Sequence, residues 1–368
     1  MFAKVSKLAV VLGVAALALT ACTPPMPPEV KAALLEQTHT CISGNANVAS
    51  GEALADAIGT IQGGMTAACP SMNLTPVDQA TGSGADLWVS SNKPSVAECK
   101  PEVTVPYALD AAVVAATLAN AGGLILSPAS VAGIFDGSIT SWDDAKITAD
   151  NGGVALDAEP IKVVPVTDAN ALKAFSAWYQ HLTGKKFDSS KLQAKAGMVS
   201  ADLGDFAEGS VALVPNSVFT VYSVNAMVPP LAASILLDAK TQEQAVPDMG
   251  GIGSAGTQLK AVAGKNGAGN TVTMDYSAKP IAPQGSDAAP TPYGAIYEVN
   301  LSLCAAGAAS GSGGKAAKVV HAVARYMLRQ DSEGSLTALV VLPELVRAQS
   351  LDAVSAGLPE PKLPKTSN

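Results

Sequence analysis

The chain has 368 residues, of which 48% are hydrophobic and only 4% aromatic, and it carries a formal charge of −8. A chain of this length is too long for one small core and suits two lobes of ordinary domain size. Its acidic balance argues against a nucleic-acid partner and against a polybasic patch that would bind a membrane surface.

The N-terminus has the pattern of an export signal. Lys4 and Lys7 precede an apolar run over residues 8–19, which is too short to span a bilayer as a helix. Residues 19–22 read Leu-Thr-Ala-Cys, which resembles the lipobox of bacterial lipoproteins. We therefore predict cleavage before Cys22, lipidation of its thiol and anchoring at the extracytoplasmic face of the bacterial cytoplasmic membrane. The alternative is an ordinary secretory peptide with an incidental cysteine.

The two ends of the chain are expected to lie outside the folded lobes. Residues 1–21 would be the signal peptide, and 22–37 the lipidated N-terminus and tether, since Thr-Pro-Pro-Met-Pro-Pro after Cys22 favours a stiff extended segment. A short helix is expected over 30–37. The polar, proline-rich residues 358–368 are expected to be disordered.

Besides Cys22, the chain has cysteines at Cys41, Cys69, Cys99 and Cys304. An even number in an oxidising compartment makes disulfides the default expectation, and three pairings are possible. A metal site would need CxxC or histidine spacing, whereas the histidines are scattered. We expect no metal.

The first half of the mature chain is expected to alternate strands and helices. A strand at 40–43 breaks into a loop at 44–47, and Ser50 then caps a helix that Gly63 and Gly64 end. Further strands are expected at 73–77, 86–90 and 102–105.

Two helices have clear boundaries in the sequence. Ser127 can cap a helix whose first position is Pro128, and Gly137 supplies its left-handed end. A strand at 161–166 leads into a second helix, which Gly184 ends. The apolar positions of that helix are Leu172, Phe175, Trp178 and Leu182.

The remaining segments are weaker in pattern but complete an α/β chain. They are short strands over 208–222, a glycine-rich loop over 250–270, a strand at 293–303, a loop at 305–314, and helices at 315–329 and 343–356.

Two glycine-rich motifs lack the context of nucleotide-binding loops. Residues 251–256 match GxGxxG, yet no hydrophobic strand precedes them, so we interpret them as a flexible loop. Residues 313–316 end like a phosphate loop, but neither the first glycine nor the Ser or Thr after the lysine is present. Nothing singles out a nucleophile, so we expect no enzyme and no cofactor.

Residues 126–144 carry the pattern Ile-Phe-x-Gly-x-Ile-x-x-Trp-x-Asp, which ends at Trp142 and Asp144. This segment closely resembles the phosphate-binding proteins of phosphate ABC importers. Similar segments follow in the family's order, at 86–94, 160–175 and 209–214, and the resemblance covers residues 40–357.

The resemblance implies a two-lobed periplasmic-binding-protein type II fold, in which the chain crosses twice between lobes and the ligand lies between them. Lobe 1 would comprise 38–106 plus 294–357, and lobe 2 would comprise 107–293, with hinges at 105–107 and 292–293. Closure of the lobes is the expected motion.

The resemblance also implies where a ligand would bind. Its candidates are polar residues beside strand ends and helix starts: Asn45, Asn47, Ser90, Ser91, Asn92, Thr167, Asp168 and Asn170. The family's anion-binding arginine falls on Val166, and its lobe-1 aspartate on Ser91. Each candidate alone could equally cap a helix or turn.

The expected function is that of a lipid-anchored solute-binding protein that captures a small polar ligand, by default phosphate or a related oxyanion, for an ABC permease. The alternative is a binding module that has lost phosphate and acts as a sensor or accessory subunit of another membrane complex. For the disulfides we predict Cys41 with Cys69, which both precede neighbouring parallel strands. Cys99 with Cys304 would then tie the two crossings of lobe 1.

Overall fold

The computed structural model describes residues 27–51, 54–78, 84–92, 94, 99–164, 168–192, 206–266, 269–275, 290–304 and 315–359. The strands are β1 (Gly44–Ser50), β2 (Met72–Val77), β3 (Leu87–Ser90), β4 (Pro101–Ala116), β5 (Ile125–Leu126), β6 (Lys162–Val163), β7 (Ser210–Pro215), β8 (Leu231–Ala232), β9 (Ser234–Asp238), β10 (Glu243–Ala245), β11 (Lys260–Asn266), β12 (Gly269–Asp275) and β13 (Ile296–Cys304). The helices are α1 (Pro28–Gln37), α2 (Ala55–Ala68), α3 (Pro128–Asp136), α4 (Ala145–Asp150), α5 (Ala169–Thr183), α6 (Asn216–Asn225), α7 (Met249–Gly256), α8 (Lys315–Met327), α9 (Gln330–Glu333) and α10 (Glu344–Val354). Over these ranges, no helix combines the length and the apolar character that a membrane crossing requires.

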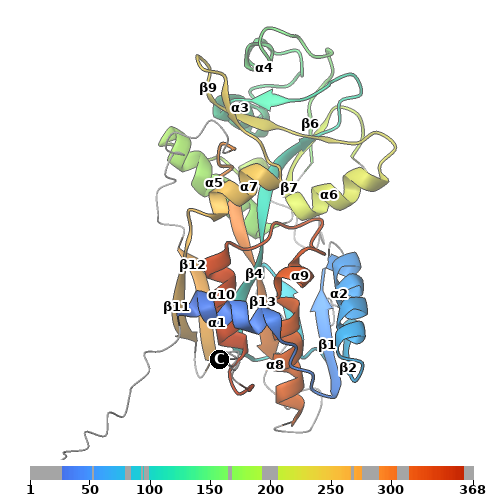
Figure 1. Cartoon of the computed structure of the whole chain (residues 1–368). Helices are drawn as coiled ribbons and strands as arrows, with labels where there is room; N and C mark the ends of the chain where they lie inside the picture. Colours follow the sequence, from blue (N-terminus) through green and yellow to red (C-terminus); the bar gives the residue numbers. More distant parts are fainter. Residues whose placement is uncertain are drawn as a thin grey trace, which may run out of the picture.

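The long strand β4 runs through both lobes of the molecule (Figure 1). Its first part pairs antiparallel with β13, from Pro101 opposite Cys304 to Ala111 opposite Ile296. Its last five residues pair with β7. Every residue from 105 to 118 is buried, as expected for a strand covered on both faces. β4 therefore positions the elements of both lobes relative to one another.

Lobe 1 is built on a sheet in the order β11-β12-β4-β13-β3-β1-β2. β1 pairs in parallel with β2 and β3. Helices α2, α8 and α10 pack on the strands of this sheet (Figure 1). Their buried faces join the strands in one apolar core, which includes Ile58, Val323 and Leu351.

Lobe 2 contains α3 and α5, whose ends follow the sequence prediction. The Ser127 hydroxyl accepts a hydrogen bond from Ser130 N, and Gly137 ends α3 at φ 79°. Gly184 ends α5 at φ 69°. Trp142 is fully buried and donates its indole N–H to Gly209 O over 3.0 Å. The most specific part of the family resemblance is therefore structural.

Several sequence predictions about β1 and α2 are wrong. The strand expected at 40–43 is β1, which spans Gly44–Ser50, so the segment expected to be a loop belongs to a strand whose Ala46 and Val48 are buried. The helix expected to end at Gly63 continues to Ala68. Gly63 and Gly64 are exposed on α2, while Ile61 and Met65 on its other face are buried in the core, which favours continuation of the helix past the glycines.

The glycine-rich segment 250–270 is not a loop. Asp248 accepts a hydrogen bond from Gly251 N and starts α7, because a side-chain cap and burial of Ile252 outweigh the low helix propensity of glycine. Strands β11 and β12 follow as a hairpin. The expected strands over 208–222 are likewise a strand followed by a helix, β7 and α6.

The hairpin of β11 and β12 also changes the expected lobe assignment. It lies within 107–293, but β12 pairs with β4 at Val103 and Thr104, in the lobe-1 sheet. The helix expected over 30–37 is confirmed as α1, but it packs on α10 and so belongs to lobe 1, not to the tether. Leu358, expected in the disordered tail, is 8% exposed. The expected signal peptide, Cys22, the expected loop at 305–314 and residues 360–368 lie outside the described residues.

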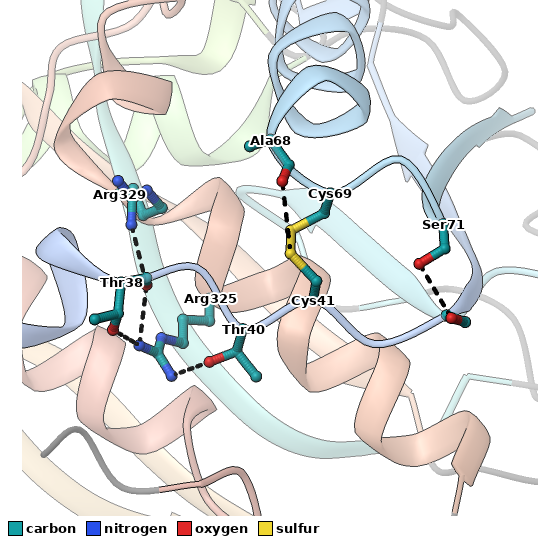
Figure 2. The surroundings of a disulfide bond; sticks show 9 residues. Thr38, Thr40, Cys41, Ala68, Cys69, Ser71, Arg325 and Arg329 are labelled. Carbon is teal, nitrogen blue, oxygen red and sulfur yellow. Dashed lines mark hydrogen bonds between the residues drawn. A yellow bond between two sulfur atoms is a disulfide. The ribbon is translucent and has the colours of Figure 1, made fainter.

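Both expected disulfides are present. Cys41–Cys69 lies beside the paired starts of β1 and β2, where Gly44 is opposite Met72 (Figure 2). Cys99–Cys304 joins the start of β4 to the end of β13. The sequence separations are 28 and 205 residues.

Because a longer closed loop restricts the unfolded chain more, the two disulfides should stabilise the folded chain by different amounts. Replacing both cysteines of the 28-residue loop by serine should lower the free energy of unfolding by about 3.6 kcal/mol, against about 5.4 kcal/mol for the 205-residue loop. Urea unfolding of the two double variants measures this difference. A smaller loss for Cys99→Ser/Cys304→Ser than for Cys41→Ser/Cys69→Ser would contradict it.

Candidate functional site

The end of β3 meets the start of α5, so that residues of the two lobes touch. The Asn170 amide donates to Asn92 Oδ1 over 2.8 Å and to Ser91 O over 3.3 Å. Ser90 accepts a hydrogen bond from Asn92 N at 3.0 Å, which holds the turn after β3. The structure thus brings three lobe-1 candidates to one lobe-2 candidate.

The first turn of α5 is held by Asp168, another of the expected residues. Its carboxylate accepts a hydrogen bond from Ala171 N at 2.7 Å and is the N-cap of the 15-residue helix. Asp168 therefore has a capping role and lies beside Asn170. Thr167, the remaining lobe-2 candidate, and Val166 lie outside the described residues.

Asn45 and Asn47 do not join this group. Both lie on β1, where Asn45 donates to Asn47 Oδ1 and Asn47 donates to Gly84 O. β1 runs parallel to β3 with Ser50 opposite Val89, so the two asparagines lie toward the opposite end of the sheet from Ser91. Placing the strand too early in the sequence turned these sheet residues into expected loop residues.

A buried carboxylate that the sequence analysis did not select lies on β4. Asp110 is 4% exposed and accepts hydrogen bonds from Ser217 Oγ at 2.6 Å, Ser217 N at 3.1 Å and Ala111 N at 2.8 Å. Its register partner on β13 is Tyr297, whose hydroxyl is also hydrogen-bonded to it. The signal in the sequence was one charged residue inside an apolar run.

Asp110 takes the place of a helix cap for α6. Pro215 precedes that helix and offers no side-chain cap, so the carboxylate of another element satisfies the first-turn amide of Ser217. The positive end of the helix dipole favours this position for an anion. α6 is thereby joined to the strand that crosses between the lobes.

Burial raises the pKa of Asp110 to about 6, and the nearby negative charge of Asp168 adds to the rise. Burial also raises the pKa of Tyr297 well above its ordinary value, with smaller contributions from both carboxylates. The chain's three arginines, Arg325, Arg329 and Arg347, all lie in or after the closing helices of lobe 1. The candidate site therefore combines amides, hydroxyls and carboxylates without a guanidinium.

A cavity of about 300 Å³ lies elsewhere in lobe 2, beside the end of β4. It carries Asp157 and Glu208, but Asn120 donates to the first and Ala119 N to the second. Its carboxylates serve the surrounding loops, and it does not touch the contact between β3 and α5.

Comparison with known proteins identifies the fold. A family model described as a PBP superfamily domain matches residues 85–324, about two thirds of the chain. The chain belongs to the PBP superfamily. No curated protein matches the sequence significantly. The expectation of a phosphate-binding-protein-like chain with two lobes is confirmed by this match and by the structural neighbours.

Among solved structures, the phosphate-bound periplasmic phosphate-binding protein PfluDING superimposes with a TM-score of 0.53 at 15% identity, covering 83% of this chain and 92% of that one. An ABC-type phosphate transport receptor from Vibrio cholerae gives a TM-score of 0.41 at 11% identity, covering 80% and 99%. At such identities the likeness to PfluDING concerns the fold of this PBP superfamily member.

The raised pKa of Asp110 makes the free energy of unfolding depend on pH in a known direction. The carboxyl holds its proton more tightly in the folded chain than in the unfolded chain, where the ordinary value is 3.8. Its stabilising effect is therefore full below about pH 4 and is lost as the pH rises through about 6.

Asp110→Asn removes this titration. The difference in unfolding free energy between variant and wild type should shift in favour of the variant by about 2 kcal/mol from pH 4 to pH 7.5. Urea unfolding across that range measures the shift. Asp56→Asn, at an exposed position of α2, is the matched control. A difference independent of pH would show that Asp110 does not titrate as its burial implies.

Proposed function

We propose that this chain is a lipid-anchored, extracytoplasmic solute-binding protein that binds a small polar ligand between its lobes and delivers it to an ABC permease. The observation that carries the proposal is the contact of Asn170 with Ser91 and Asn92 across the lobes, in a chain of the PBP superfamily. Such a contact is the part of the molecule that lobe opening would break.

The default ligand is phosphate or a related oxyanion. The N-termini of α5 and α6 both lie at this junction and carry the positive ends of helix dipoles, which favour an anion. Asp110 and Asp168 bring negative charge close by, so a ligand that still carries a proton and can donate a hydrogen bond is favoured over a fully deprotonated one. Protonated phosphate meets that condition, whereas sulfate does not.

The moving units proposed are 38–106 with 294–357, joined by the hairpin of β11 and β12, and the rest of 107–293. Hinges near 105–107 and 292–293 would lie within β4 and just before β13. Tyr293, at the second hinge, is buried and donates its hydroxyl to Ala112 O over 2.8 Å. That bond ties the two crossings together where the lobes would bend.

A second candidate function rests on the charge of the junction. The residues in the positions of the family's arginine and aspartate are Val166 and Ser91, and all three arginines of the chain lie elsewhere. A chain that no longer binds an oxyanion could serve as a sensor or accessory subunit of a membrane complex. A stoichiometric partner other than a permease, recovered from solubilised membranes, would favour this candidate.

Calorimetric titration with phosphate, sulfate and sugar phosphates tests the ligand. We expect phosphate to bind more tightly than sulfate at pH 7, and Asn170→Ala to weaken binding about tenfold through loss of two interlobe hydrogen bonds. Asn120→Ala, which removes a lobe-2 contact to Asp157, is the matched control and should bind as wild type. Absence of heat and of thermal shift with all three anions would exclude an oxyanion ligand.

Metabolic labelling with palmitate tests the anchor. The wild-type chain should take up label and stay with membranes, whereas Cys22→Ser should take up none and appear in the soluble extracytoplasmic fraction, because no thiol remains to be acylated. Thr20→Ser keeps a small residue before the cut and serves as control. If the wild-type protein took up no label, the lipid anchor would be excluded and the N-terminus would be an ordinary secretory signal.

A further inference from the structure

Helix α1 is part of the folded body of lobe 1. Leu34 and Leu35 are 8% and 1% exposed, and α1 packs along α10. Lys31 forms an ion pair with Asp352 near the C-terminal end of α10, and Glu36 forms one with Arg347 near its start. Charge pairs to the two ends of α10 therefore hold both halves of α1.

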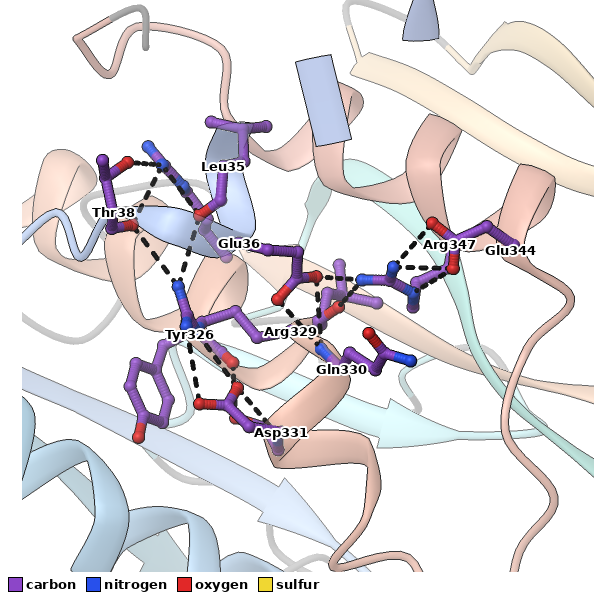
Figure 3. Close-up of polar contacts among 12 residues, drawn as sticks. Leu35, Glu36, Thr38, Tyr326, Arg329, Gln330, Asp331, Glu344 and Arg347 are labelled. Carbon is purple, nitrogen blue, oxygen red and sulfur yellow. Dashed lines mark hydrogen bonds and ion pairs between the residues drawn. The ribbon is translucent and has the colours of Figure 1, made fainter. Parts of the chain in front are cut away.

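The C-terminal end of α1 is held by two buried arginines. The last carbonyls of a helix have no partner within it, and α1 has no basic residue in its last turn. Arg325 donates to Leu35 O and Thr38 O at 3.4 Å. Arg329 donates to the same two atoms at 3.2 and 3.4 Å (Figure 3). Arg325 and Arg329 are 3% and 8% exposed. They supply from another helix the cap that α1 lacks.

The third arginine completes what we call the arginine clamp, formed by Arg325, Arg329 and Arg347. Arg347 is 2% exposed and pairs with Glu36 and, at 2.7 Å, with Glu344. Glu36 also accepts from Gln330 N at 3.2 Å (Figure 3). Burial and the neighbouring charge of Arg329 lower the pKa of Arg325, while the charge of Glu36 raises it. The carboxylates of Glu36, Glu344 and Asp331, together with the negative end of α1, thus offset three adjacent cations.

The segment that follows α1 is fixed as well. Arg325 donates to Thr40 Oγ1 at 2.7 Å, and the next residue, Cys41, is bound to Cys69 (Figure 2). His39 stacks on Tyr326 with ring centroids 5.8 Å apart. From Leu34 to Cys41 the chain is therefore bound to lobe 1 by hydrogen bonds, ring contact and a covalent bridge.

We infer that α1 is a strut that holds the end of lobe 1 formed by the N-terminus of α1 and the C-terminus of α10 against the headgroup surface of the membrane. This inference rests on the proposed lipidation of Cys22. Between Cys22 and Pro28 the backbone spans at most about 21 Å, because an extended chain covers about 3.5 Å per residue. Since α1 stays folded on lobe 1 and does not lengthen the tether, lobe 1 stays within that distance of the lipid.

The direction of α10 gives the orientation of the molecule. Val340, just before it, is bridged to Leu109 in the middle of β4, where the lobes join. α10 then runs away from the junction along lobe 1 (Figure 1), so Asp352, near its C-terminal end, and its partner Lys31 lie on the side of α10 that is farther from the junction. Lobe 2 consequently points away from the bilayer.

Hydrogen exchange tests the clamp without any lipid. In the Cys22→Ser chain, peptides covering α1 should be protected, and Arg325→Gln/Arg329→Gln should speed their exchange at least tenfold while peptides of α3 stay unchanged. Lys318→Gln, on the exposed face of α8, is the matched control. The strut would be overturned if α1 of the Cys22→Ser chain, with all three arginines present, exchanged as fast as an unstructured peptide. This outcome does not depend on whether the double variant folds.

Energy transfer tests the orientation in the lipidated full chain on phosphatidylethanolamine and phosphatidylglycerol vesicles that carry an acceptor lipid. A donor on Ala356→Cys, after α10, should transfer more efficiently than one on Ala149→Cys, on α4 in lobe 2. About ten Gly and Ser residues inserted between Pro27 and Pro28 should abolish the difference.

The outcomes separate the two proposals. Flotation with the vesicles and equal transfer from both positions would overturn the orientation while the anchor stands. Failure to float would overturn both the anchor and the placement, and protection of α1 would then remain as a property of the fold alone.

Discussion

The hydrogen bonds to the Asp110 carboxylate are the interaction on which the junction of the lobes depends. The residue lies in the middle of β4, is opposite Tyr297 on β13, and satisfies the first turn of α6. A carboxylate in this position is desolvated, which would be unfavourable without these donors. One buried side chain thus links both strands that cross between the lobes to a helix of lobe 2.

Helix ends in this protein are satisfied in two ways, and the difference explains much of what the sequence could predict. α3 and α5 carry their own caps, Ser127 and Asp168, and their own terminal glycines, so their boundaries follow from residues a few positions apart. α6 and the C-terminus of α1 depend on side chains far away in sequence, Asp110 and the arginine clamp. No local pattern marks such caps. α6 was correspondingly predicted as strand, whereas α1 was predicted as a helix but assigned to the tether and not to lobe 1.

The same reasoning applies to the sheet and the site. β1 was placed early because Asn45 and Asn47 favour turns, whereas pairing with β2 and β3 on either side decides the matter in the structure. Ser91, Asn92 and Asn170, which the family resemblance offers as ligand-binding candidates, lie together in the structure, since strand ends and helix starts keep their places in a shared fold. Asp110 was missed because the family positions used for comparison do not include it, and its burial follows from tertiary packing.

All three arginines of the chain lie around α1, and none lies at the contact between β3 and α5. Guanidinium groups are the residues best suited to bidentate recognition of an oxyanion, and equally to holding several buried carbonyls and a carboxylate at once. In this chain all three serve the second purpose, around Leu35, Glu36 and Thr38. A flexible tether needs no such fixation, because its function depends only on length. Burial of every arginine against one short N-terminal helix is understandable if the position and direction of that helix matter to the molecule, which is the condition that a strut at a membrane surface imposes.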